Sequence, residues 1–207
     1  MAIIKSGATS DNLTVDPTSK AARITPYDNE GNYRGVKATY RAASIIPYVP
    51  AVTINRTIFT IGGSATKTIT VKKIIVTGMT LTAVQYIAIN AVKYSTATAG
   101  GTSTSLPQVP LDSSQAAGTA NQVRTYTAVP TDGTLVGTIA SRRVLGQATT
   151  AAAGGRVHDP MVFEFGDHND NRGVVLRGTS QELALLFPVA PASTVTIAVE
   201  VEWTEEA

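Results

Sequence analysis

The C-terminal segment of the chain constrains the fold more than any other stretch. Its apolar side chains fall on every second position: Val195, Ile197, Val199, Val201 and Trp203. Polar residues, mostly threonine and glutamate, fill most of the intervening positions. This alternation predicts a β-strand with one buried face and one solvent face. The segment is long and contains no proline, so we expect a central strand of a sheet with Trp203 buried.

The rest of the chain repeats this β signal. Stretches such as "VTINRTIFTI", "TKTITVKKIIVTG" and "QELALLF" are rich in β-branched or apolar residues and are separated by turn residues. The stretch "LTAVQYIAINAVKYST" also satisfies helical spacing, but its content of Tyr, Ile and Val favours a strand. We count roughly ten strand candidates and no strong helix, which predicts an all-β protein, an antiparallel β-sandwich or jelly roll.

Turn signals suggest how neighbouring strands connect. We predict a hairpin between Ala21–Tyr27 and Val36–Arg41, because the residues between them include the turn-forming string "DNEGN". The prolines in "SIIPYVPAV" indicate a connector. Two strands are expected on either side of Pro130–Gly133, and a strand–turn–strand unit over Met161–Gly178. The polar residues 95–121 read as a long loop, a feature that is usually functional or interfacial.

The N-terminal residues have a different composition. Residues 1–20 are rich in Ser, Thr, Asp and Gly and read as an extended arm. We therefore divide the chain into an arm and hairpin, 1–35, that attaches the protein to a larger particle, and a jelly-roll domain, 36–207. An arm without a core of its own must bury its apolar side chains against something else. These are Ile3, Ile4, Leu13 and Val15.

Charge and composition exclude several classes of protein. The chain has 17 Lys and Arg against 15 Asp and Glu, which is too balanced for a nucleic-acid surface. Charged residues are only 15% of the chain, which favours a protein that hides surface in an assembly. There is no cysteine, and no stretch approaches the roughly 20 apolar residues of a membrane helix. The start lacks the apolar core of a signal peptide, so we expect no general secretion.

The most site-like cluster is "DHNDNRG". Its Asp167, Asn169 and Asn171 have the alternate spacing of the first ligands of a calcium loop. The glycine then comes one position late, and Gly178 stands where an acidic residue is expected. Asn, Asp and Gly are also the residues of an ordinary hairpin turn, so a plain turn is the preferred interpretation.

No catalytic motif is evident. The only histidines, His158 and His168, each neighbour an aspartate, but a triad is defined in space and not by sequence adjacency. Carboxylates that could pair in glycoside hydrolysis are Glu164, Asp167, Asp170, Glu200 and Glu202. Glu200 and Glu202 share the polar face of the last strand. Exposure of that face to solvent is sufficient to account for glutamates at these positions. Five tyrosines at 40, 48, 86, 94 and 126 could form a sugar-stacking platform, but spread over several strands they read as core-edge residues. We expect no enzymatic activity and no cofactor.

The string "IKSGATSDNLTVDPTSKAARITPYDNEGNYRG" resembles a segment at the start of tailed-bacteriophage virion proteins, across about residues 3–35. The string "VDPTSKAAR" carries most of this resemblance, and Pro26 departs from it at a position where a strand residue is commoner. Looser similarity to the jelly-roll part of phage structural proteins lies in "INAVKYSTATAGGTSTSLPQVPLDS", "RTYTAVPTDGTLVG", "VVLRGTSQELAL" and "VEVEWTEE".

The resemblance implies a structural role in the virion, for a protein made in the host cytoplasm. It would be a capsid decoration or cement subunit, or a head or tail appendage, bound to the major capsid or other virion proteins. Such knobs are commonly homotrimers, and symmetric copies would cover weakly charged surface. We expect no nucleic-acid or membrane partner. The alternative is a tail-associated module that binds receptor glycan through residues 95–121 or 167–173.

Overall fold

A computed structural model describes residues 14–15, 22–23, 37–48, 56–81, 83–146, 159–166 and 173–206. The chain divides into two compact units, Met1–Lys37 and Ala38–Ala207. In the first unit, β1 (Thr14–Val15) pairs antiparallel with β2 (Ala22–Arg23). The apolar arm positions Ile3, Ile4 and Leu13 lie outside the described residues, and Val15 is described only as part of β1.

The second unit is a β-sandwich, so the prediction of an all-β antiparallel sandwich is confirmed. None of the described residues forms a helix that could cross a membrane. The strands of this unit are β3 (Ala38–Tyr48), β4 (Arg56–Gly62), β5 (Thr68–Leu81), β6 (Gln85–Tyr94), β7 (Ser103–Ser105), β8 (Val109–Pro110), β9 (Arg124–Tyr126), β10 (Leu135–Gly146), β11 (Met161–Glu164), β12 (Val174–Leu176), β13 (Glu182–Phe187) and β14 (Val195–Glu206).

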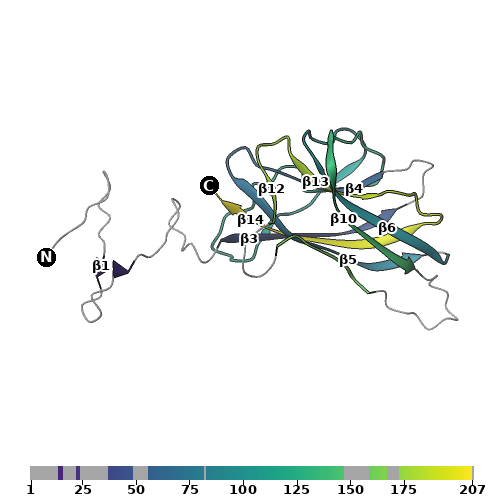
Figure 1. Ribbon diagram of the computed structural model, residues 1–207, viewed down its shortest axis with the longest axis horizontal. Helices are drawn as coiled ribbons and strands as arrows, with labels where there is room; N and C mark the ends of the chain where they lie inside the picture. The colour runs from purple at the N-terminus through teal and green to yellow at the C-terminus, as the bar shows by residue number, and fades with distance from the viewer. Residues whose placement is uncertain are drawn as a thin grey trace. The chain divides into compact units, whose positions relative to one another are not determined.

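Two six-stranded sheets make up the sandwich (Figure 1). One, called here the β6–β13 sheet, has the order β10-β6-β13-β4-β9-β7. The other, the β5–β14 sheet, has the order β11-β5-β14-β3-β8, with β12 also paired to β5. As its length and lack of proline predict, β14 is a central strand that pairs with β5 on one side and β3 on the other.

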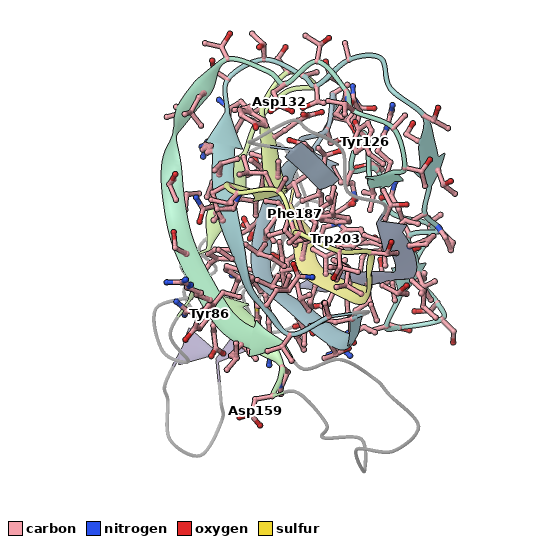
Figure 2. The ribbon with its side chains drawn as sticks, turned by 90° about the vertical axis from the view of Figure 1, so that its right-hand side faces the viewer. Tyr86, Tyr126, Asp132, Asp159, Phe187 and Trp203 are labelled. Carbon is pink, nitrogen blue, oxygen red and sulfur yellow. The ribbon has the colours of Figure 1, made fainter. Side chains whose placement is uncertain are left out.

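The core lies between the two sheets. Alternate residues of β14 point into it, and Trp203 is fully buried and stacks on Tyr40 with ring centroids 5.8 Å apart. From the opposite sheet, Leu183, Leu185 and Phe187 of β13 join the same cluster. Figure 2 shows Phe187 and Trp203 in the interior of the sandwich. The burial of these large side chains is the main source of stability of such a fold.

Several local predictions are wrong because strand partners are chosen over long sequence distances. Of the predicted hairpin between Ala21–Tyr27 and Val36–Arg41, the described parts have other partners: β2 pairs with β1, and β3 pairs with β14 and β8, while the residues from 24 to 36 lie outside the described residues. The "SIIPY" part of the expected connector belongs to β3, in which Pro47 lies opposite Thr196. A proline is tolerated there because β8 reaches only Tyr40 and Arg41, so beyond them one side of β3 has no described partner.

Other predicted strands exist but do not pair with each other. β9 and β10 flank Pro130–Gly133 as expected, yet β9 pairs with β4 and β7 whereas β10 pairs with β6. β11 and β12 both pair with β5. The ambiguous stretch that contains Tyr86 and Ile89 is a strand, β6, as favoured.

Candidate functional site

The two outer faces of the sandwich differ in what covers them. On the β6–β13 sheet, the outward side chains Val92, Tyr94, Ala184 and Leu186 form a second buried apolar cluster. All six residues of β13 are buried, which means that both of its faces are covered. The long polar segment between β6 and β10 lies beside this cluster: its Asp132 and Gly133 line one depression with Val92, Tyr94 and Leu186.

The covering segment, called here the flap, consists of residues 95–102 and 127–134. Its two halves are joined by backbone hydrogen bonds between Ala99 and Thr131 in both directions, at 2.9 and 2.7 Å. The Ser95 amide donates to the Thr134 carbonyl at 2.9 Å, directly after the paired ends of β6 and β10. The flap is therefore a continuation of the β6–β10 ribbon that folds back over its own sheet.

Glu182 holds the flap from below. Its carboxylate is fully buried and accepts a hydrogen bond from the Thr98 amide at 2.8 Å. With the Gln122 side-chain amide turned so that its nitrogen faces these acceptors, it donates to the same carboxylate at 2.7 Å and to the Thr98 carbonyl at 3.1 Å. Gln122 has a φ of 53°, and no other described non-glycine residue has a positive φ. These bonds offset the cost of that left-handed backbone.

Burial perturbs the titration of this cluster. Desolvation raises the pKa of Glu182, opposed by the hydrogen bond from the Thr98 amide and by the charge of Arg124. Desolvation raises the pKa of Tyr94 to about 12, opposed by its hydrogen bond with Thr57. The same cause raises the pKa of Tyr126. Among the described side chains, four buried polar atoms of this region lack a hydrogen-bond partner: Thr98 Oγ1, Arg124 Nε, Tyr126 OH and Asp132 Oδ1.

A second buried carboxylate fixes the rest of the long segment. Glu205 accepts hydrogen bonds from the Thr119 amide and hydroxyl, both at 2.8 Å, and from the Ala120 amide at 3.2 Å. The Trp203 indole donates to it at 3.0 Å. Residues 95–121, predicted as a loop, thus contain two short strands and are tied to the sandwich at both ends.

The outer face of the β5–β14 sheet is open by comparison. Ile45 is 71% exposed and Ala43 is exposed beside it, with Ala198 opposite Ile45 on β14. These residues line a shallow depression of about 280 Å³. At one end Arg41 binds Glu200 at 2.8 Å and, through Nε, Glu202 at 2.9 Å. Glu202, by this hydrogen bond, raises the pKa of Arg41.

The part of the sandwich formed by β6 and β10 carries about half of the exposed large apolar side chains among the described residues. Eleven large apolar side chains are exposed among the described residues, and six lie on or next to these two strands. They are Val84, Tyr86, Leu135, Val136, Ile139 and Leu145. The Arg143 guanidinium lies 4.1 Å from the centroid of the Tyr86 ring. We call these seven residues the β6–β10 surface; Figure 2 shows Tyr86 at the periphery beside β10.

The structure brings few of the predicted site residues together. Glu200 and Glu202 share Arg41, whereas Glu164 is exposed on β11. Asp167, Asn169, Asn171, Asp170 and both histidines lie outside the described residues. Within the described ranges no cluster of His, Cys, Asp and Glu could hold a metal ion. Of the tyrosines, Tyr40, Tyr94 and Tyr126 are buried and Tyr86 is 61% exposed, so these four do not form a shared platform.

Sequence reasoning missed both the flap and the β6–β10 surface. A signal for the flap was present: "ELALLF" has no alternation of polar and apolar residues, and such a run predicts a strand buried on both faces. The run "LVGTIA" contains no charge or proline, the residues that usually protect an edge strand from pairing with another chain. The order of strands in the sheet is needed to show that this strand lies at an edge. Comparisons of the chain with protein-family models, curated proteins and solved structures found no match.

Proposed function

We propose that this chain is a non-enzymatic structural subunit of a tailed-bacteriophage virion, with the role of a capsid decoration protein or a head or tail appendage. The resemblance of residues 3–35 to virion proteins supports this assignment. The observation that carries it is the β6–β10 surface, where six of the eleven exposed large apolar side chains gather on one side of the sandwich. Exposed apolar side chains concentrated on two neighbouring strands are typical of sites of protein–protein association.

The proposal assigns two tasks to two parts of the chain. The arm would attach the subunit to the particle by burying apolar side chains, and the sandwich would contact other subunits. Its low content of charged residues, 15%, agrees with a surface that is partly covered in an assembly. Neither task requires a reacting group.

The arm assignment is tested with full-length variants. One variant replaces the four apolar arm positions by aspartate: Ile3, Ile4, Leu13 and Val15. The control adds the same charge at polar positions of the arm: Ser6, Thr9, Ser10 and Thr18. After mixing with virions that lack the protein, we expect the control to co-sediment and the apolar variant to stay in the supernatant. Equal sedimentation of the two variants would refute the assignment.

A further inference from the structure

The flap is joined to the β6–β13 sheet at both of its ends. Residues 95–102 lead from β6 to β7, and residues 127–134 lead from β9 to β10. In the sheet, β13 and β4 separate β6 from β9, so the flap connects two parts of the sheet that are not neighbours. Between these ends, the Thr98 amide donates to Glu182, the first residue of β13. The Glu182 carboxylate is therefore a contact at which the flap is held to the sheet.

Glu182 is buried without a cationic partner. It is fully buried and forms no ion pair among the described residues. Glu205, the other buried carboxylate, accepts hydrogen bonds from Thr119, Ala120 and Trp203, whereas the donors to Glu182 are one backbone amide and one side-chain amide. An ionised carboxylate buried without a cation is costly unless hydrogen bonds replace its water shell. The protonated form of Glu182 thus suits the closed flap better than the ionised form.

The titratable groups around Glu182 come from three elements. Tyr94 lies on β6, Arg124 and Tyr126 lie on β9, and Asp132 lies on the flap. The charge of Asp132 opposes ionisation of Glu182, and the charge of Arg124 favours it. Burial raises the pKa of both tyrosines, so they stay neutral when Glu182 titrates. Figure 2 shows Asp132 and Tyr126 toward the same end of the sandwich.

The closed flap leaves several buried polar atoms without a hydrogen-bond partner among the described residues: Thr98 Oγ1, Arg124 Nε, Tyr126 OH and Asp132 Oδ1. Each such atom costs free energy that contact with water recovers. A depression of about 200 Å³ borders the flap at Asp132 and Gly133 and is lined by Tyr94 and Leu186. These features favour opening of the flap by itself, without unfolding of the sandwich.

We propose that the flap opens in response to proton release: it is closed while Glu182 is protonated, and ionisation of Glu182 as the pH rises shifts it toward an open form. In the open form the carboxylate is hydrated and the Thr98 amide donates to water. The outward side chains Val92, Tyr94, Ala184 and Leu186 become accessible, while the strands of both sheets stay paired.

The sign of this effect follows from burial. Desolvation raises the pKa of Glu182 in the closed form, so the closed form binds the proton more tightly than the open form. The stabilisation of the closed flap is complete below the pKa of a hydrated glutamate, about 4.3, and is lost as the pH rises through the closed-form pKa.

Amide hydrogen exchange of the full-length protein at a series of pH values tests the proposal. The exchange rates are divided by those of unstructured peptides, which leaves the protection due to structure. In the wild type we expect the protection of Ala99 and Thr131, whose amides bond across the flap, to fall several-fold as the pH rises above about 4.3. The amides of β14 should keep their protection, because the sandwich stays folded.

Two matched variants assign the effect to one carboxylate. Glu182→Gln has nearly the same shape and does not titrate, so its flap protection should not depend on pH. Glu164→Gln makes the same change at an exposed carboxylate of β11 and should behave as the wild type does. Flap protection in the wild type that is independent of pH would overturn the proposal, as would the same pH dependence in Glu182→Gln. An equal loss of protection in β14 would also overturn it, because the whole sandwich would then be unfolding.

Discussion

The outer faces of the two sheets differ in whether other parts of the chain cover their outward side chains. On the β6–β13 sheet the outward residues Tyr94, Ala184 and Leu186 are buried beneath the flap, and a buried carboxylate, Glu182, fastens that cover. On the β5–β14 sheet the outward residues are small or exposed, with Ile45 71% exposed and the charges of Arg41, Glu200 and Glu202 gathered at one end. The difference shows that the flap extends the core of its own subunit.

This comparison also separates stability from assembly. Side chains beneath the flap are expected to contribute to the free energy of unfolding of the single chain. Side chains on the open face and on the β6–β10 surface are expected to matter little for unfolding, because they remain in water in the isolated subunit. Substitutions on the two kinds of surface should therefore affect different measurements.

The largest difference is expected between Leu186→Ala and Ile45→Ala. Leu186 is 5% exposed beneath the flap, so its truncation leaves a cavity and should cost about 2–5 kcal/mol of unfolding free energy. Ile45 is 71% exposed, so its truncation should change stability by less than about 0.5 kcal/mol. Urea unfolding of both variants measures the difference. Similar losses for the two would mean that the open face is covered within the subunit.

A smaller effect is expected from Glu182→Ala. Removal of the carboxylate leaves the Thr98 amide and the Gln122 side chain without their acceptor under the flap, at a cost of about 1–3 kcal/mol. Amide hydrogen exchange should show faster exchange at Thr98 and at Ala99, whose bond to Thr131 holds the flap together. Glu164→Ala, at an exposed carboxylate of β11, is the control and should leave both measurements unchanged.

The smallest expected effect is a change in the pH dependence of the unfolding free energy when Glu182 is replaced by glutamine, Glu182→Gln. Because burial raises the pKa of Glu182 in the folded state, the proton binds the folded state more tightly than the unfolded one. Its contribution to stability is full below the unfolded pKa of about 4.3 and is lost as the pH rises through the folded pKa. The glutamine variant does not titrate, so its stability relative to wild type should increase as the pH rises above the unfolded pKa of about 4.3. A stability difference that stays constant as the pH rises from about 4.3 would contradict the direction of the shift.

Much of the fold could be predicted because it depends on local patterns. The alternation from Val195 to Trp203 predicts a half-buried strand, since side chains of a strand point to opposite faces. Its length and lack of proline predict its central position, which the pairing with β3 and β5 confirms. The division of β14 into core and solvent positions fails only near its end, where Thr204 and Glu205 are buried.

Which strands pair with each other could not be predicted from the sequence, because strand pairing depends on contacts between segments far apart in the chain. A turn signal between Ala21–Tyr27 and Val36–Arg41 favours a hairpin, yet β3 pairs with β14, more than a hundred residues away. Sheet order in turn decides which strand is an edge, and so whether Val136 and Ile139 meet a neighbour or solvent. No local property of these residues distinguishes the two outcomes.

The residue pattern is sufficient to predict that the chain forms β-strands, which faces of the most regular strands are apolar, and that the protein is a sandwich. The burial of Glu182 and Glu205 as hydrogen-bond acceptors, the position of the long polar segment on one outer face and the edge position of β10 become visible in the folded protein alone. The physical reason is that alternation within a strand is set by backbone geometry. What covers each face depends on the summed packing of segments far apart in the chain.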